Sequence, residues 1–231
     1  MNPTSSSRKR SERPTRILNA AARLMARYGY DKTTMDDIAR EAGVSKGALY
    51  LVWPGKEELF DALFEHEMKQ LVLDLRGRVE ADAQGGSIAS LYGHTLLALQ
   101  NSPLICALYT RDGRVLGDFI HRQDPQRYTQ RLLMSQESIG RMQAAGLLRS
   151  DIRPEVMAYL FSLVALGFLS ISGVIPAADS PPLAETATAM SAMIQSGLAL
   201  PGGDNTVTKE STLTMLDFLL TQYDERGKYG K

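Results

Sequence analysis

Residues 33–56 read TTMDDIAREAGVSKGALYLVWPGK, and this stretch decides how the rest of the chain is organised. Thr34 followed by Asp37 has the form of an N-capping box, which predicts a short helix over MDDIAREA. Gly43 can adopt a positive φ without steric cost, so the chain can turn sharply after that helix. Ser45 then caps a second short helix, which is predicted to end near residue 52.

The apolar positions of this stretch are spaced so that the two helices share one small core across the turn. They are Ile38, Ala42, Val44, Leu49 and Val52. This is the layout of a helix-turn-helix, whose second helix enters the major groove of DNA. An ordinary αα-hairpin inside a helical protein has the same spacing and is the alternative interpretation. A cation at the start of a helix is disfavoured by the macrodipole, so Lys56 favours the DNA-binding interpretation, in which it meets a phosphate.

A longer stretch, residues 16–63, carries a family resemblance. It reads RILNAAARLMARYGYDKTTMDDIAREAGVSKGALYLVWPGKEELFDAL and contains GY--TT, DIA--AGVSKG-LY and K-EL. It resembles the DNA-binding domain of the TetR (tetracycline-repressor) family of bacterial transcriptional regulators. Trp53 stands where the family usually has Phe, so a larger aromatic side chain occupies that position here. Val52 stands where many members carry His or Tyr; if relatives contact the DNA backbone from that position, this protein has lost one contact.

The resemblance and the helix-turn-helix layout together predict the residues that contact DNA. They are Thr33, Thr34, Ser45, Lys46, Gly47, Tyr50 and Lys56. Residues 45–47 open the second helix, where free backbone N–H groups favour phosphate and side chains can reach base edges. Tyr50 lies one turn further on, and the resemblance implies that it touches DNA. Thr34 and Lys56 are expected to anchor phosphates from the flanking helices.

Charge is unevenly distributed, although the formal net charge is zero. Residues 1–56 hold eleven Lys/Arg and five Asp/Glu, a balance of +6, and the remainder carries the compensating −6. A basic module on an acidic body suits DNA contact at one end of the molecule. Residues 1–14 are rich in Ser, Arg and Pro and are expected to be disordered alone. They form either a solvated tail or a basic arm that meets phosphates or an adjacent minor groove.

Helical periodicity continues through the rest of the chain. We predict a first helix over residues 15–28, which completes a three-helix domain, and a long helix from residue 57 to about 83. Further helices are predicted over 87–100, 103–109, 125–145, 155–175, 183–200 and 206–225, with 112–124 the least regular segment. No strand-like alternation or internal repeat is evident. The predicted fold is all-α, with a basic arm (1–14), a helix-turn-helix DNA-binding domain (15–56) and a larger helical-bundle effector-binding and dimerisation domain (57–231).

One predicted helix contains no charged residue from residue 156 to 178. A run of that length can span a membrane, but three serines and two glycines dilute it. A buried core helix or a subunit interface is the favoured alternative, because a helix that is apolar all round must be buried somewhere.

Catalytic and metal-binding patterns are not evident in the sequence. His66, His94 and His121 are scattered without metal-ligand spacing, and no Gly-rich phosphate loop or G-x-S-x-G motif occurs. Cys106 is the single cysteine, which excludes an internal disulfide, fits a reducing cytoplasm and is read as a small buried hydrophobe. The N-terminus has no apolar segment typical of a secretory signal. We therefore expect a cytoplasmic protein that is not an enzyme and uses no cofactor or metal.

The body is rich in methionine and aromatic residues, which at helical spacing form either an ordinary core or a plastic apolar pocket. The resemblance favours the pocket, between the helices at about 87–110, 125–145 and 155–175. Its predicted lining is Tyr92, His94, Cys106, Tyr109, Phe119, Met134, Met142, Tyr159 and Phe161. His94 and Tyr109 are expected to orient the polar end of a ligand.

These observations predict a homodimeric, sequence-specific DNA-binding transcriptional regulator, a repressor released from its operator by a lipophilic small molecule. The dimer interface is expected on the helices at 155–175 and 183–200 or 206–225. The rival interpretation is a DNA-binding interaction protein whose body binds a protein partner, and a helical enzyme ranks below both. A large enclosed cavity in the body would favour the effector, whereas a filled core beside an exposed apolar patch would favour the protein partner.

Overall fold

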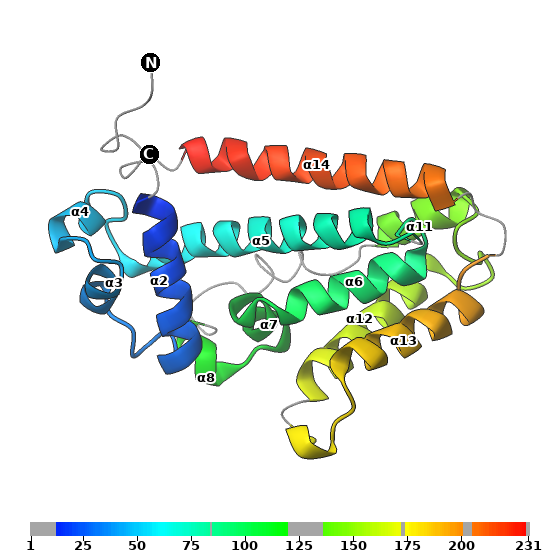
Figure 1. The fold of residues 1–231 in the computed structure, drawn as a ribbon, viewed down its shortest axis with the longest axis horizontal. Coiled ribbons are helices and arrows are strands. Elements are labelled where there is room, and N and C mark those ends of the chain that lie inside the picture. The colour runs from blue at the N-terminus through cyan, green and yellow to red at the C-terminus, as the bar shows by residue number, and fades with distance from the viewer. Residues whose placement is uncertain (1–12, 84, 120–135, 172–173, 201–204, 230–231) are drawn as a thin grey trace.

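The computed structural model describes residues 13–83, 85–119, 136–171, 174–200 and 205–229. Within these ranges the fold is all-α, as predicted, with one isolated bridge between Leu148 and Ala199 and no strand. A small three-helix domain lies at one end of a larger helical body (Figure 1). Most of the predicted arm, residues 1–12, lies outside the described residues.

The small domain consists of α2 (Arg13–Tyr28), α3 (Met35–Glu41) and α4 (Lys46–Tyr50). α2 buries one face, which carries Ile17, Ala20, Ala21 and Met25. It ends at Gly29, whose φ of +85° lies in the left-handed region that glycine adopts without strain. α2 starts two residues before the predicted position and α4 ends two residues earlier than predicted, a fraction of one turn in each case.

Side-chain hydrogen bonds cap the N-termini of α3 and α4, the two helices of the helix-turn-helix. The Thr34 hydroxyl accepts from the Asp37 amide at 3.1 Å, and the Asp37 carboxylate accepts from the Thr34 amide at 3.2 Å. The Ser45 hydroxyl accepts from the Ala48 amide at 3.2 Å and so caps α4. Gly43 has a φ of +62° in the turn between the helices. The predicted capping box, turn and second cap are confirmed.

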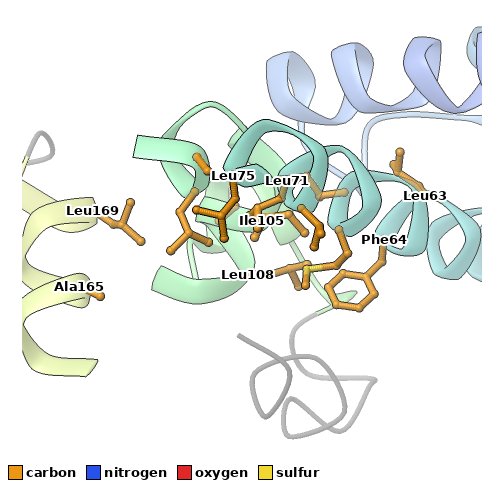
Figure 2. Close-up of a cluster of buried hydrophobic side chains, with 14 of the residues drawn as sticks. Leu63, Phe64, Leu71, Leu75, Ile105, Leu108, Ala165 and Leu169 are labelled. Atoms are coloured by element: carbon orange, nitrogen blue, oxygen red, sulfur yellow. The ribbon is translucent and has the colours of Figure 1, made fainter. Parts of the chain in front are cut away.

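α5 (Lys56–Ala81) begins in the small domain and runs the length of the body (Figure 1). Its apolar residues recur at three- and four-residue steps and are buried, as the sequence predicts. These residues are Leu59, Phe60, Leu63, Phe64, Met68, Leu71, Val72, Leu75 and Val79. Figure 2 shows this buried stripe beside α7 (Pro103–Thr110), whose labelled side chains are Ile105 and Leu108. α5 is therefore both the link between the domains and the central helix of the core.

The remaining helices are α6 (Ile88–Gln100), α8 (Gly113–Leu116), α11 (Gln136–Ala144), α12 (Pro154–Ser170), α13 (Leu183–Gly197) and α14 (Asn205–Tyr229), with a short 3₁₀ turn at Ala177–Asp179. Of these, α6 and α14 pack directly on α5, and the others pack on these two or on neighbouring helices. α6 and α7 follow Ser87 and Ser102, whose hydroxyls accept from the Ser90 and Ile105 amides. α14 runs back along α5 in the opposite direction, toward the small domain (Figure 1).

The largest difference from the predicted bounds is at the end of α12, which ends at Ser170 rather than near residue 175. α11 begins at Gln136, and the predicted start at residue 125 falls in 120–135, outside the described residues. The segment predicted to be irregular contains α8, a single turn capped by Asp112.

α12 explains the uncharged run in the sequence, because it is buried on one face and uncovered on the other. The buried side carries Met157, Ala158, Phe161, Ala165, Phe168 and Leu169. The exposed large side chains are Val156, Tyr159, Leu160, Leu163, Val164 and Leu166, which we call the α12 outer face. No helix in the described part of the chain combines the length and apolar character needed to cross a membrane.

Candidate nucleic-acid interface and ligand cavity

α4 is anchored on one side and open to solvent on the other. Leu49 is fully buried beneath it, whereas Ser45, Lys46 and Gly47 are exposed. Tyr50, one turn after Lys46, keeps 46% of its surface exposed. Four of the seven predicted DNA-binding residues therefore share one exposed face, which we call the α4 face.

Gly47 is not required by the packing of this domain. A Cβ added there would meet nothing within 4 Å, and Gly47 is absent from the glycines with positive φ. Glycine inside a helix lowers the free energy of unfolding by about 0.5–1 kcal/mol relative to alanine. The fold therefore gives no reason for a glycine at position 47. A glycine on an exposed helix face does permit close approach by another backbone.

Charges of both signs lie around the α4 face. The Lys46 ammonium pairs with the Asp36 carboxylate of α3, and these side chains are 65% and 47% exposed. Two hydrogen bonds from Thr34, followed by that from Arg40, lower the pKa of Asp37, which therefore stays ionised at neutral pH. Exposed ion pairs of this kind contribute little to stability, so Lys46 can exchange Asp36 for a phosphate at small cost.

The two adjacent threonines occupy different environments. Thr33 is buried, and its hydroxyl donates to the Gly29 carbonyl at 2.8 Å, which satisfies the end of α2. The structure therefore does not bring the Thr33 side chain to the surface with the other predicted DNA-binding residues. Thr34 is exposed, although its hydroxyl is already engaged with Asp37 in the capping box.

Lys56 lies at the junction between the two domains. Its ammonium sits 4.0 Å from the centroid of the Tyr30 ring, a cation–π geometry. The same hollow is bordered by Asp31, Glu58 and Asp118. Lys56 therefore has an internal role in addition to the predicted phosphate contact, which stays a prediction.

An aromatic cluster ties the DNA-binding domain to the body beside α5. The rings of Tyr30, Phe60 and Phe119 lie 3.9–5.4 Å apart between centroids. The Tyr30 amide also donates to the Val115 carbonyl at 2.7 Å. The segment that follows α7 is thus a second attachment of the small domain, separate from the continuous helix α5.

Asp31 strengthens this second attachment. Its carboxylate accepts from the Asp118 amide at 2.8 Å. A Cβ on Gly117 would lie 1.9 Å from the same carboxylate, and Gly117 has a φ of +52°. Glycine at this position therefore allows both the turn and the close approach of Asp31.

An apolar cavity of about 630 Å³ lies in the body between six helices. α5, α6, α7, α11, α12 and α14 all contribute to its walls. The lining residues are Met68, Leu71, Val72, Leu75, Leu91, Tyr92, Thr95, Leu96, Leu99, Tyr109, Ser138, Met142, Phe161, Ser162, Ala165, Met215, Leu216, Phe218, Leu219, Gln222 and Tyr223. None of these described side chains is ionised at neutral pH. A volume of this size is typical of small-molecule sites.

The two tyrosines on the inner walls remain protonated. Burial raises the pKa of Tyr92 and the pKa of Tyr109, because the charged phenolate is poorly solvated there. The Tyr92 ring packs against Phe161 with centroids 4.8 Å apart, and its hydroxyl donates to the Phe161 carbonyl. The cavity therefore offers neutral polar groups on an apolar background.

Four of the nine predicted pocket residues line this cavity: Tyr92, Tyr109, Met142 and Phe161. Phe119 does not, because it belongs to the aromatic cluster at the domain junction. Met134 lies outside the described residues. The cavity therefore lies partly between the helices at which the sequence predicts a pocket, with a different set of lining side chains, and ligand binding there stays a prediction.

The other three predicted pocket residues point elsewhere. His94 faces Asp82, with 2.9 Å between Nε2 and the carboxylate, in a separate groove between α6 and α13. Tyr159 is 64% exposed on the α12 outer face. Cys106 packs against the core without lining the cavity, and burial raises the pKa of its thiol. His94 is thus not placed to orient a ligand in the cavity, whereas Tyr109 is.

Sequence reasoning missed the walls supplied by α5 and α14. The α5 residues Met68, Leu71 and Leu75 belong to its apolar stripe, which periodicity assigns to the core without distinguishing a filled core from a hollow one. A signal exists on α14, where Met215 and Phe218 are large apolar residues that remain 49% and 62% exposed. Because both side chains line the cavity and are exposed to solvent, they mark its mouth and not its interior.

No group of three or more His, Cys, Asp or Glu side chains within the described ranges is arranged to hold a metal ion.

Residues 17–63 match the family described as bacterial regulatory proteins, tetR family. An HTH-type transcriptional regulator of Bacillus subtilis, YhgD, is 42% identical over 60 residues, which cover 26% of this chain and 31% of YhgD. The chain thus aligns with only about a third of that relative's length.

Solved structures resemble the whole described fold at low sequence identity. The complex of SmeT with triclosan has a TM-score of 0.58 and 20% identity, and covers 82% of this chain and 92% of SmeT. SmeT is the repressor of the Stenotrophomonas maltophilia multidrug efflux pump SmeDEF. FadR from Bacillus subtilis, in complex with stearoyl-CoA, has a TM-score of 0.58 and 15% identity, and covers 79% of this chain and 98% of FadR. At these identities the likeness establishes the fold.

Proposed function

We propose that this protein, whose residues 17–63 match the tetR family of bacterial regulatory proteins, is a sequence-specific transcriptional regulator, a repressor that a lipophilic small molecule releases from its operator. One observation carries this proposal. α5 begins at Lys56 in the DNA-binding domain, and further along it forms a wall of the cavity. A single continuous helix therefore joins the surface for DNA to the space for a ligand.

The DNA-binding part of the proposal rests on the α4 face. Ser45, Lys46 and Gly47 open the recognition helix, where they can reach phosphates and base edges. Tyr50 projects from the same face, and its exposed ring is available for contact with DNA. Thr34 and Lys56 flank the helix on the two sides, as expected of residues that fix its position by meeting phosphates.

A homodimer supplies two recognition helices and covers the α12 outer face. Large apolar side chains such as Leu160, Leu163 and Leu166 are 39–46% exposed there. A contiguous apolar helix face is typical of an interface, and a two-fold pair of identical faces is self-complementary. Two copies related by a two-fold axis would present α4 to successive major-groove faces.

The effector part rests on the cavity. Its volume of about 630 Å³ and its apolar lining suit a lipophilic compound. SmeT and FadR, which share the fold, are seen with triclosan and with stearoyl-CoA. To convert a mostly bound population into a mostly free one, a ligand must favour the released form by several kcal/mol. Burial of a lipophile contributes about 25 cal/mol per Å² to binding, and only the part of it that differs between the two states shifts the population.

The rival, a protein partner in place of a small molecule, draws on the α12 outer face alone. A second copy of the chain already accounts for that face, whereas a protein partner does not account for the apolar cavity, which opens to solvent beside α14. The cavity therefore favours the small-molecule effector.

A selection experiment tests the regulator proposal. Purified protein is incubated with random duplex DNA, and bound sequences are enriched, read and measured by fluorescence anisotropy. We expect a two-fold symmetric operator with half-sites spaced by about one helical turn. Enrichment of no common sequence, by a protein shown to be folded and dimeric, would contradict sequence-specific binding.

A further inference from the structure

Among the residues that the structure describes, the most exposed large apolar side chain lies directly after α4. Leu51, the C-terminal cap of that helix, is 86% exposed. A single exposed leucine needs no explanation on most surfaces, because folded proteins expose much apolar surface. The position of Leu51 makes it informative here, because it follows Tyr50 at the edge of the α4 face. Leu51 was not among the residues predicted to contact DNA.

Leu51 continues the helical geometry of α4. Its amide donates to the Gly47 carbonyl at 3.0 Å, and its φ of −66° and ψ of −29° are helical. Residues four positions apart lie on one side of a helix, with about 5–6 Å between their Cβ positions. Gly47 and Leu51 therefore form a row on the exposed side of α4, beside the row formed by Lys46 and Tyr50.

Gly47 leaves its end of this row open. A Cβ added to Gly47 would meet nothing within 4 Å, so the Leu51 side chain does not fill that space. Carbon atoms make van der Waals contact at about 3.5–4.0 Å, so the open position can admit one methyl group from outside. We call Gly47 and Leu51 the apolar notch.

Thymine is the base that offers such a notch a partner. Its C5-methyl group lies in the major groove, where adenine, guanine and cytosine present hydrogen-bond donors and acceptors. The Leu51 side chain has neither a donor nor an acceptor, so it cannot pair with those groups or with a phosphate. Contact with them would remove their water without a replacement hydrogen bond, which costs free energy.

α4 is short enough for the apolar notch to lie in the groove together with the start of the helix. At 1.5 Å per residue, Leu51 lies about 9 Å along the helix from Ser45. The major groove of B-DNA is about 12 Å wide. An orientation that brings Ser45 and Lys46 to the base edges therefore keeps Leu51 within the width of the groove.

We propose that the apolar notch recognises one thymine in each half-site of the operator, with the thymine C5-methyl group packed against Leu51 in the space left open by Gly47. This inference rests on the proposed function, because it requires α4 to occupy the major groove. It adds Leu51 to the residues that determine sequence specificity. It also gives Gly47 a role that the fold does not provide.

Replacement of thymine by uracil tests the inference, because it removes the methyl group and keeps the base pair. The selected operator is synthesised with deoxyuridine at each thymine position in turn, in both half-sites together. Fluorescence anisotropy with the full-length protein measures each dissociation constant at constant salt. We expect one position at which uracil weakens binding roughly fourfold per half-site, the value of one buried methyl group, and thus roughly fifteenfold for the dimer.

Variants locate the methyl contact on the apolar notch. Leu51→Ala should bind the thymine and uracil operators with nearly equal affinity, because the apolar partner of the methyl group is removed. Gly47→Ala should also lower the ratio of the two dissociation constants, because its added methyl group takes the place of the thymine methyl group. Leu73→Ala, at an exposed leucine of the body, is the matched control and should keep the wild-type ratio. Far-UV circular dichroism checks that every variant is folded.

The outcomes separate this inference from the proposed function. An operator whose affinity depends on no thymine methyl group, or whose half-sites contain no thymine, overturns the thymine contact and leaves a sequence-specific regulator intact. A uracil penalty that persists in Leu51→Ala, or that Leu73→Ala also removes, overturns it as well. If the selection enriches no common sequence, the proposed function fails and this inference fails with it.

Discussion

The DNA-binding domain and the body place their functional residues in opposite ways. The α4 face comes from residues 45–50, a single short helix whose ends are fixed by local caps. The cavity takes residues from six helices that span positions 68 to 223. Local chemistry thus determines the first site, whereas the second exists only through tertiary packing.

The difference also appears in how each region treats its apolar residues. In the DNA-binding domain the apolar side chains of α2 and α3 are buried together, whereas Leu51, directly after α4, is 86% exposed. The body leaves apolar side chains uncovered at several places, among them the α12 outer face and the α14 side of the cavity. Uncovered apolar surface of this kind is expected where a second copy or a ligand completes the packing.

The largest expected effect is on the α4 face. Tyr50→Ala should leave the fold intact, because Tyr50 is half-exposed, and should abolish specific operator binding. Two lost contacts per dimer, each worth about 1–3 kcal/mol, weaken binding on the order of a thousandfold. Fluorescence anisotropy measures it, with Tyr28→Ala, at a similarly exposed residue of α2, as the control. Undiminished affinity in a folded Tyr50→Ala variant would remove Tyr50 from the interface.

The next effect tests whether the body's uncovered face is a dimer interface. Leu166→Glu should yield monomers, because it places a charge in an apolar contact. Loss of the second recognition helix should weaken operator binding on the order of a hundredfold. Leu73→Glu, on the equally exposed Leu73 of α5, is the control, since both leucines are 42% exposed. Sedimentation measures the oligomeric state. Native protein that is monomeric at micromolar concentration, or a Leu166→Glu variant that is still dimeric, would contradict the interface.

Lys56 lies at the junction of the two regions, so its substitution tests both DNA binding and stability. Lys56→Ala should weaken binding to all DNA sequences alike and lower the salt slope by about 0.9 for each lost phosphate contact. Loss of the contact with Tyr30 should also lower the free energy of unfolding by about 0.5–1 kcal/mol. Anisotropy titrations at several salt concentrations measure the slope. A changed base preference with an unchanged slope would mean that Lys56 reads sequence.

What could be predicted from the sequence alone also differs between the DNA-binding domain and the body. The Thr34 and Ser45 caps, the turn at Gly43 and the buried stripe of α5 were predictable, because each depends on residues a few positions apart. Thr33 was not, since the GY--TT pattern does not tell a surface threonine from one that satisfies a helix end.

For the cavity, composition identified the region but not the lining. His94 and Tyr92 differ by two positions on α6, which places them on different sides of the helix, and only packing decides which side faces inward. Phe119 was assigned to the pocket because it is aromatic, yet it packs at the domain junction. The contribution of α14 depends on a contact with α5 across more than 140 residues, as in the Arg76–Asp217 pair.

The smallest effect concerns Gly47, where stability and function should oppose each other. Gly47→Ala should raise the free energy of unfolding by about 0.5–1 kcal/mol, because the site is open and helical. The added methyl group should weaken operator binding, since it stands on the α4 face. Gly43→Ala is the contrast: its φ of +62° predicts destabilisation. Urea denaturation and anisotropy measure both, and a Gly47→Ala variant with full affinity would leave this glycine unexplained.

The central claim is that occupancy of the cavity releases the DNA. Ala165 lines the cavity and is 5% exposed, so Ala165→Phe places bulk in the ligand space without touching the DNA-binding domain. The measurement is anisotropy of a labelled operator as decan-1-ol, a lipophilic probe, is added to wild type and to Ala165→Phe. The account predicts release from wild type, with Ala165→Phe binding the operator normally and retaining it. Operator that stays bound to wild type at decan-1-ol concentrations that saturate the protein, or equal release from both proteins, would contradict it.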